Sequence, residues 1–274
     1  MIQYIYLGRV AYDEALALQQ ELVELRHQDR IANTLLLLDH PPVLTLGRNA
    51  RRSNILATDE MLARKGVTVH EINRGGDVTY HGPGQLIGYP IFDLRSLTNS
   101  TGGRLGPVDF VRRIEEALIR LSASYGVLTG REQGRTGVWT IAAAGREKKI
   151  GAIGVHVSRG ITSHGFAFNV TTDLRDFQWI VPCGIADRDV TSLELEMPGP
   201  VPTLEETANT AARCFGQVFN EQILALENGP AGLAALRAHA RARIEAQQIG
   251  TPMRVPEEIE HLTQPDHPAK PVRA

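Results

Sequence analysis

The stretch RGGDVTYHGPGQ, from Arg74 to Gln85, is the most informative part of this chain. Its glycines and its proline interrupt it too often for a helix, and it carries more polar side chains than an ordinary hairpin loop needs. Glycine lets a ligand lie directly against main-chain N–H groups, because no Cβ stands in the way. We therefore predict that this stretch lines a ligand site, with Arg74, Thr79, Tyr80 and His81 around the ligand.

Apolar patterns on both sides of this stretch predict a mixture of strands and helices. Helical spacing indicates helices over residues 11–26, 107–125, about 203–226 and 231–248. Short apolar or alternating runs indicate strands over 34–38, 43–46, 67–72, 86–92, 138–141, 149–157 and 161–170. Strands outnumber helices and do not alternate with them regularly. This pattern favours an α+β fold, in which a mixed sheet is flanked by helices.

The composition excludes several classes of protein. The 274 residues are 42% apolar and 22% charged, as in an ordinary globular protein, and the net charge of −2 argues against nucleic-acid binding. No apolar run is long enough to span a membrane, and the first residues do not resemble a signal peptide. With only two cysteines, the chain fits a reducing cytoplasm. It contains no phosphate loop and no metal-binding motif such as His-Glu-x-x-His or Cys-x-x-Cys.

Cys183 is the candidate nucleophile. It lies between Pro182 and Gly184, so we expect a turn that exposes the sulfur and leaves backbone N–H groups available for an oxyanion. The alternative is a buried structural thiol. Cys214 lies on the apolar face of a predicted helix, where we expect it to fill the core.

Lys149 is the second candidate, at the start of the strand-like segment KIGAIG. A lysine after Arg146, Glu147 and Lys148 is by itself a solvated turn charge. Near a cysteine, however, a cation favours the reactive thiolate. Alternation along a strand would point Lys148 and Lys149 to opposite faces, and the Lys-Ile-Gly register favours Lys149.

The remaining charged and titratable candidates are less specific. His81 and His164 lie beside glycines and are candidates for a pocket, whereas we interpret His40, His70 and His156 as structural or exposed. A basic cluster follows Gly47, and it is either a solvated loop or a dock for an acidic partner. Its members are Arg48, Arg51 and Arg52.

Over roughly residues 1–225 the chain resembles the lipoyl(octanoyl) transferases, of the biotin/lipoate protein ligase-like superfamily. The resemblance rests on ordered motifs, which are DHPP (39–42) followed by TLG (45–47), RGG (74–76) with TYHGPGQ (79–85), KIGAIG (149–154), HGFAFN (164–169) and PCG (182–184).

The resemblance implies roles for most of these residues. Cys183 would carry an acyl-thioester intermediate, and Lys149 would lower its pKa. The acyl group would be contacted by Arg74, Gly75, Gly76, Asp77, Val78, Thr79, Tyr80 and His81, by Ala152, Ile153 and Gly154, and by Gly165, Phe166 and Ala167. His164 is an auxiliary candidate. The proton of the acceptor amine would go to Lys149, with His81 or His164 as alternatives.

The resemblance also implies the fold and the partners. We expect a largely antiparallel sheet in a catalytic domain over residues 1–226, followed by a C-terminal helix and a proline-rich tail over 227–274. The donor would be octanoyl-acyl carrier protein. The acceptors would be lipoyl domains of 2-oxoacid dehydrogenase complexes and the glycine cleavage H protein. No cofactor or metal is implied.

Three other interpretations remain open. An ATP-dependent lipoate or biotin ligase shares the fold and needs no cysteine. A lipoyl-domain or carrier-binding protein would have no catalysis. A papain-type hydrolase is disfavoured, because the only histidines after Cys183 are His239, His261 and His267, in the last helix and the tail.

Overall fold

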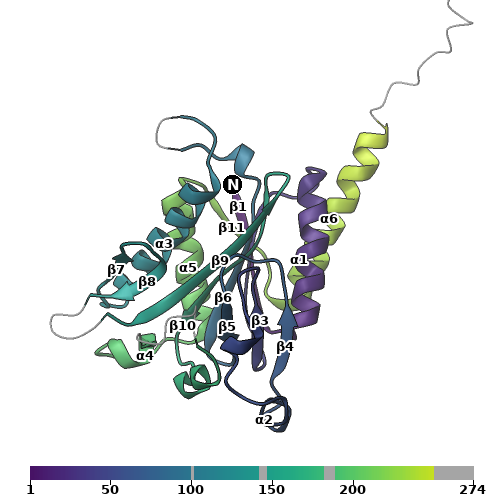
Figure 1. Cartoon of the computed structure of the whole chain (residues 1–274). Coiled ribbons are helices and arrows are strands. Elements are labelled where there is room, and N and C mark those ends of the chain that lie inside the picture. The colour runs from purple at the N-terminus through teal and green to yellow at the C-terminus, as the bar shows by residue number, and fades with distance from the viewer. Residues whose placement is uncertain (100–101, 142–146, 182–188, 250–274) are drawn as a thin grey trace, which may run out of the picture.

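A computed structural model describes residues 1–99, 102–141, 147–181 and 189–249 of the chain. The chain folds around an eight-stranded sheet and a smaller three-stranded sheet (Figure 1). The order in the large sheet is β11-β1-β2-β6-β10-β9-β8-β7. Among these strands β1 pairs in parallel with β2 and β11, and the other pairs are antiparallel. The prediction of an α+β fold with a mixed, largely antiparallel sheet is confirmed.

The strands of the large sheet are β1 (Ile2–Arg9), β2 (Asn33–Asp39), β6 (Gln85–Ile91), β7 (Thr129–Glu132), β8 (Arg135–Thr140), β9 (Lys149–Ser158), β10 (Ile161–Asn169) and β11 (Ile223–Ala225). The helices are α1 (Tyr12–His27), α2 (Asp59–Arg64), α3 (Pro107–Ala123), α4 (Leu193–Glu196), α5 (Leu204–Phe219) and α6 (Gly229–Ile249). Short 3-10 helices are η1 (Arg52–Asn54), η2 (Leu94–Ser96) and η3 (Leu174–Trp179).

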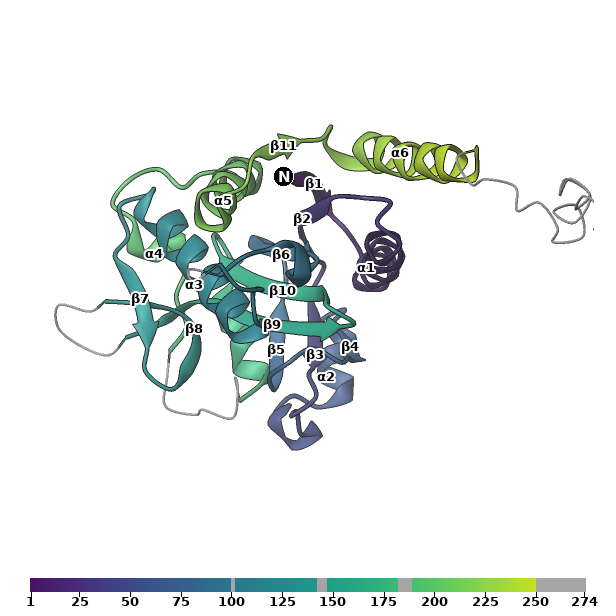
Figure 2. The ribbon, with the colours of Figure 1, turned by 90° about the horizontal axis from the view of Figure 1, so that it is seen from above.

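Helices cover both faces of the large sheet, and this explains the continuous apolar run in β2. Leu35 and Leu37 point to one face, into a core shared with α3 and α5. Leu36 and Leu38 point to the other face, into a core shared with α1 and α6. Because successive side chains alternate across a strand, a strand buried on both faces has apolar residues at every position. Figure 2 shows α3 and α5 on one side of the sheet and α1 on the other.

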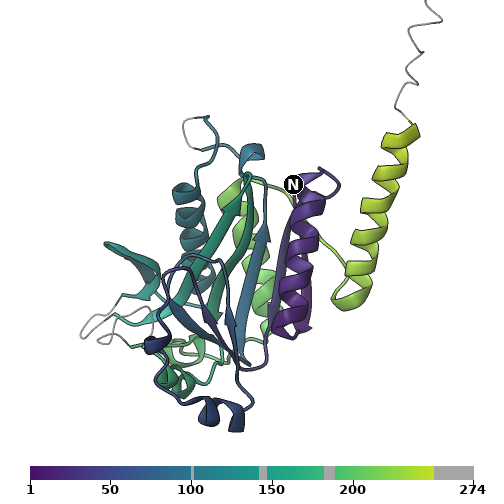
Figure 3. The same ribbon diagram turned by 45° about the vertical axis from the view of Figure 1, so that its right-hand side comes forward.

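The last helix packs beside the first one. Leu236 and Ala240 of α6 are buried in the same cluster as Leu18 and Leu22 of α1. Arg237 also donates hydrogen bonds of 2.8 and 2.6 Å to Glu21. Figure 3 shows the two helices running alongside each other. Residues after 226 therefore contribute to the core.

The small sheet carries the glycine-rich stretch against the large one. Its order is β4 (Thr68–Glu71), β3 (Val43–Leu46) and β5 (Val78–His81), and β3 pairs in parallel with β4 and antiparallel with β5. The middle of the stretch is therefore a strand, which joins Arg74 and its glycines to a packed sheet. Its apolar side chains form a separate cluster that includes Leu44, Leu46, Val78 and Tyr80.

Some elements were not predicted, and the end of one helix was predicted wrongly. The strand β1 was not predicted, because its residues show no clean alternation. The helix expected over 203–226 begins with the predicted capping box of Thr203 and Glu206 but ends at Phe219. Asn220 adopts a left-handed conformation, with φ 54°, which stops the helix and lets β11 pair with β1.

None of the helices in the described ranges has the length and the apolar composition that crossing a membrane requires.

Candidate active site

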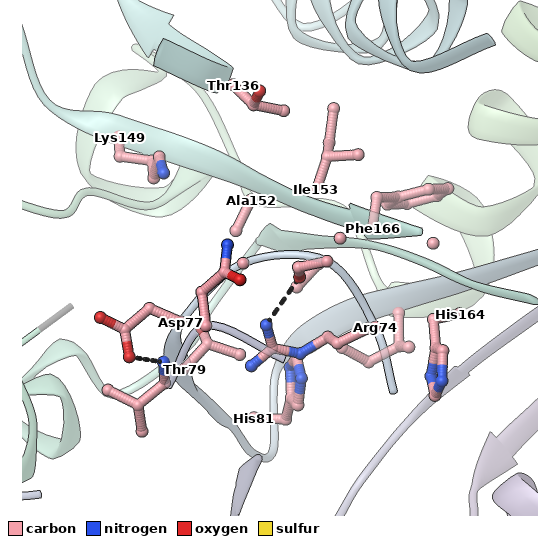
Figure 4. Close-up of a pocket in the computed structure, with 18 of the residues that line it drawn as sticks. Arg74, Asp77, Thr79, His81, Thr136, Lys149, Ala152, Ile153, His164 and Phe166 are labelled. Atoms are coloured by element: carbon pink, nitrogen blue, oxygen red, sulfur yellow. Dashed lines mark hydrogen bonds between the residues drawn. The ribbon is translucent and has the colours of Figure 1, made fainter. Parts of the chain in front are cut away.

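A cavity of about 390 Å³ lies between the glycine-rich stretch and the β6–β10–β9 part of the large sheet. Figure 4 shows Lys149 at one end, Phe166 and His164 at the other, and Ala152 and Ile153 between them. Glycines, alanines and apolar side chains line the cavity together with polar side chains, among them Arg74, Asp77, His81 and His164. The cavity thus suits an extended ligand that has both an apolar part and polar groups.

Small residues on β9 let the glycine-rich stretch approach the sheet closely. A Cβ on Gly154 would lie only 2.7 Å from the carbonyl oxygen of Gly75. The Gly75 N–H donates to the carbonyl of Val155 at 3.1 Å. Residues 74–77 therefore lie directly on β9, and a side chain at position 154 would push them away.

Arg74 is buried in the cavity wall. Its guanidinium donates to the Thr45 side chain at 3.2 and 2.9 Å, to the Thr45 carbonyl at 2.6 Å and to the Gly75 carbonyl at 3.0 Å. These bonds orient the group from β3 and leave its charge near the middle of the cavity (Figure 4). The position suits a residue that holds a polar group of a ligand.

Two histidines line the cavity, and both are neutral at pH 7. Burial lowers the pKa of His81 to about 3, with further lowering by His40 and Arg74. Burial and Arg74 lower the pKa of His164 to about 4. His81 Nδ1 lies 2.8 Å from the Gln85 side-chain oxygen, and His164 Nε2 lies 2.8 Å from the Asn73 side-chain oxygen. Each of these nitrogens therefore donates to an amide, and the opposite nitrogen is an acceptor.

Lys149 is held between two strands. Its Nζ lies 4.8 Å from the centroid of the Trp139 ring, a cation–π distance. Gly137 leaves room for it, because a Cβ there would lie 3.0 Å from Lys149 Cε and 2.6 Å from the Gly151 carbonyl oxygen. The buried Glu115 accepts the Gly137 N–H at 3.0 Å and so fixes β8 at this point.

The structure separates Lys148 from Lys149. Lys149 lines the cavity. Lys148 instead lies on the outside, with its Nζ 3.7 Å from the Glu196 carboxylate and its side chain 46% exposed.

Cys183 lies outside the described residues. The chain on either side of its segment is attached close to the cavity. Val181 N–H donates to the Asn54 carbonyl at 2.8 Å, and Lys149 N–H donates to the Asp189 carbonyl at 3.0 Å. Cys214, the other cysteine, is buried in α5, and burial raises the pKa of its thiol.

The structure brings together almost all the residues predicted for the site. These are Arg74, Gly75, Gly76, Asp77, Val78, Thr79, His81, Lys149, Ala152, Ile153, Gly154, His164, Gly165, Phe166 and Ala167, all of which line the cavity. Tyr80 differs, because alternation along β5 turns its ring into the small-sheet cluster, against Phe177 and Trp179. Its hydroxyl donates to Asp176 at 2.6 Å.

Several lining residues were not predicted. Tyr12 comes from the first turn of α1, Tyr89 and Ile87 from β6, and Thr136 and Trp139 from β8. His40 Nδ1 donates to the Val10 carbonyl at 2.7 Å, so its Nε2 accepts from the Tyr89 hydroxyl at 2.7 Å, and the histidine interpreted as structural supports the cavity wall. No motif in the sequence links these positions to the glycine-rich stretch.

Within the described residues, no group of three or more histidine, cysteine, aspartate or glutamate side chains is arranged to hold a metal ion.

Comparison with known proteins gives the family. A family profile, the lipoyl protein ligase A/B catalytic domain, matches residues 11–216. An octanoyltransferase of Acidobacterium capsulatum is 64% identical over 231 residues, which cover 83% of this chain and 94% of that protein. An octanoyltransferase of Koribacter versatilis is 55% identical over 228 residues, covering 83% of this chain and 88% of that protein.

Solved structures agree with the fold. A bipartite lipoate protein ligase of Thermoplasma acidophilum superposes with a TM-score of 0.63 at 16% identity, covering 88% of this chain and 92% of that one. A lipoate-protein ligase A bound with ATP also gives 0.63, at 14% identity, covering 88% and 95%. At these identities the likeness concerns the fold alone.

The chain therefore belongs to the lipoyl protein ligase A/B catalytic-domain family. Within this family it is an octanoyltransferase, an acyltransferase of protein lipoylation.

Proposed function

We propose that this enzyme takes an octanoyl group from octanoyl-acyl carrier protein and holds it as a thioester on Cys183. It then passes the group to a lysine of a lipoyl domain in 2-oxoacid dehydrogenase complexes or the glycine cleavage H protein. The observation that carries the proposal is the cavity itself, with Lys149 at one end and small or apolar residues of β9 and β10 along it. The presence of only two cysteines fits action in a reducing cytoplasm.

The octanoyl tail lies along the cavity from Lys149 toward Phe166. Ala152 and Ile153 of β9 and Ala167 of β10 offer it apolar or small surfaces. Burial of each methylene contributes about 0.8 kcal/mol, so a chain two carbons shorter loses about 1.6 kcal/mol. The residues from Arg74 to Thr79 then face the carbonyl group and the hydrocarbon chain of the octanoyl group.

In the first half of the reaction the Cys183 thiolate attacks the donor thioester. A new carbon–sulfur bond forms to Cys183, and the bond to the carrier sulfur breaks. The carrier leaves as a thiolate and takes a proton from the Lys149 ammonium. Backbone N–H groups near the carbonyl stabilise the oxyanion that forms on the way.

In the second half the amine of the acceptor lysine attacks the acyl-cysteine. A carbon–nitrogen bond forms, the bond to Cys183 breaks, and the excess proton of the attacking nitrogen goes to the now neutral Lys149. The enzyme returns to its thiolate and ammonium form. Conversion of a thioester to an amide is downhill, so no nucleotide is needed.

We assign the proton transfer to Lys149, because neither histidine in the cavity wall suits it. A base works best when its pKa lies near the working pH. The pKa values of His81 and His164 are lowered to about 3 and about 4, so each binds a proton poorly at pH 7. We infer that these histidines act as neutral hydrogen-bonding groups in the wall.

The catalytic domain covers residues 1–226 in this proposal. The family profile over residues 11–216 supports this division. The C-terminal helix and tail, residues 227–274, would not take part in the reaction.

Intact-mass analysis after incubation with octanoyl-acyl carrier protein tests the mechanism. The expected result is a mass gain of one octanoyl group, located on Cys183 after digestion and discharged by an added lipoyl domain. Cys183→Ser should form no thioester and should transfer no octanoyl group to the lipoyl domain. Cys214→Ala should behave like the unchanged enzyme. Modification of the lipoyl domain only with free octanoate and ATP would refute the proposal and indicate a ligase.

A further inference from the structure

The part of the acyl cavity away from Lys149 is polar. Tyr12 of α1, His81 of β5 and His164 of β10 line it, and Figure 4 shows His164 at the end opposite Lys149. Burial raises the pKa of Tyr12, and the charge of Arg74 opposes this shift. Burial lowers the pKa of both histidines, and Arg74 lowers it further. The three side chains therefore surround Arg74, and we call these four residues the polar end of the cavity.

Each side chain around Arg74 keeps one polar atom without a partner among the described residues. The Tyr12 ring packs against His40 at a centroid distance of 5.2 Å, but its hydroxyl forms no hydrogen bond there. Each cavity histidine donates through one nitrogen to a side-chain amide, which leaves Nε2 of His81 and Nδ1 of His164 as acceptors. Two acceptors beside a hydroxyl suit a ligand group that both donates and accepts a hydrogen bond, as an alcohol does.

His164 is held at this end in spite of backbone strain. It has φ 54°, a left-handed conformation, in the middle of strand β10. The β10–β6 register places it opposite Pro90, which has no N–H to pair with it. Its own N–H donates instead to the Gln19 side chain of α1 at 2.8 Å. Strained residues that several neighbours hold in place are typical of functional sites.

The cavity is longer than an octanoyl group. From Lys149 to Val155, which pairs with His164, β9 advances about 20 Å, at about 3.3 Å per residue. An extended octanoyl group spans about 9 Å, at about 1.3 Å per carbon–carbon bond. In the proposed function the carbonyl lies beside Lys149, so the tail ends near Ala152 and its pairing partner Ala167. The polar end begins beyond that point.

We propose that the polar end sets the chain-length limit of the acyl group, because it rejects longer hydrocarbon tails and accepts equally long tails that end in a hydroxyl. This inference rests on the proposed function, whose orientation places the octanoyl tail short of the polar end. A longer hydrocarbon tail would cover the Tyr12 hydroxyl and the histidine nitrogens and offer them no hydrogen bond, which is unfavourable. A terminal hydroxyl would donate to a histidine and accept from Tyr12. The enzyme would therefore also transfer ω-hydroxyacyl groups.

Two donors of equal length test the proposal. They are dodecanoyl- and 11-hydroxyundecanoyl-acyl carrier protein, whose acyl groups span about 14 Å and differ only in a terminal methyl or hydroxyl. We measure kcat/KM for transfer to a lipoyl domain, with the octanoyl donor as the reference. The hydroxylated donor should exceed the dodecanoyl donor about ten- to a hundredfold, because only its tail satisfies the polar atoms. An apolar cavity end predicts the opposite order, since a methyl group gains more than a hydroxyl from leaving water.

Tyr12→Phe tests the polar end directly. It removes the hydroxyl and keeps the ring that packs against His40. The ratio of the two kcat/KM values, hydroxylated over dodecanoyl, should fall about three- to tenfold, since one of the three partners is lost. Both enzymes receive the same donors, so any effect of the carrier on the tail cancels. Tyr125→Phe is the matched control, because its hydroxyl donates to Thr210 at 3.1 Å outside the cavity, and it should keep the ratio.

The possible failures are distinguishable. Equal kcat/KM for the two long donors, or a higher value for the dodecanoyl donor, would overturn the proposal while octanoyl transfer stands. Failure to use either long donor would also overturn it, because a steric stop would then end the cavity before the polar groups. A ratio that Tyr12→Phe leaves unchanged would overturn it as well. Absence of transfer from the octanoyl donor would instead refute the proposed function.

Discussion

Gly137→Ala tests how Lys149 is positioned. Gly137 has φ +128°, and an added Cβ would lie 2.6 Å from the Gly151 carbonyl oxygen and 3.0 Å from Lys149 Cε. The unfavourable backbone conformation costs about 1–2 kcal/mol. The contact with a main-chain oxygen, which cannot rotate away, adds about 1–3 kcal/mol. We expect a loss of about 3 kcal/mol, which lowers Tm by about 6–12 °C in a domain of this size.

The same methyl group should displace Lys149. A misplacement of about 1 Å in a reacting group can reduce the rate about a hundredfold. We therefore expect a large fall in kcat for octanoyl transfer, measured at a temperature where the variant remains folded. Far-ultraviolet circular dichroism at that temperature separates loss of positioning from unfolding.

Gly126→Ala is the matched control for backbone strain. Gly126 has φ +76°, and a Cβ there would meet no atom within 4 Å. It should lose about 1–2 kcal/mol and retain full activity. If Gly137→Ala behaves like this control in both stability and turnover, the packing of Gly137 against Lys149 does not position the lysine, and the reasoning is refuted.

Two further predictions concern buried charge. The pKa values of His40, His81 and His164 are lowered by burial to about 4, 3 and 4, so the unfolded chain binds more protons than the folded one below pH 6.5. The free energy of unfolding should be at its full value above pH 6.5 and should fall by about 1.4 kcal/mol per pH unit for each histidine as the pH drops toward 4. A Tm that stays constant between pH 6.5 and 5 would contradict this prediction. Glu115 is fully buried and accepts from Arg112 at 2.7 Å, from Arg131 at 3.1 Å and from Gly137 at 3.0 Å. Glu115→Ala should therefore cost about 2–4 kcal/mol in chemical denaturation, with Glu116→Ala, whose side chain is 34% exposed, as the milder comparison.

Local chemistry made much of this protein predictable from its sequence. The clear helix α3, the strands β2, β9 and β10, and the capping box of Thr203 depend on neighbouring residues, and periodicity records them. The glycine-rich stretch also indicated the site. A simple turn needs only one or two such residues, and each additional glycine loses conformational entropy on folding. The glycine and alanine residues of β9 and β10 lie in two further motifs that indicated the same site.

Only the tertiary structure decided which of these segments meet. Pairing between distant strands places Gly75 on β9 and brings Tyr12 and Trp139 into the cavity, and no local pattern encodes that register. It also turned Tyr80 away from the site, because alternation along β5 depends on where the strand begins. The neutral state of His81 and His164 follows from burial, which the sequence around them does not determine. The sequence by itself determined the local elements and the residue types of the site, whereas long-range packing decided their partners, their faces and their charges.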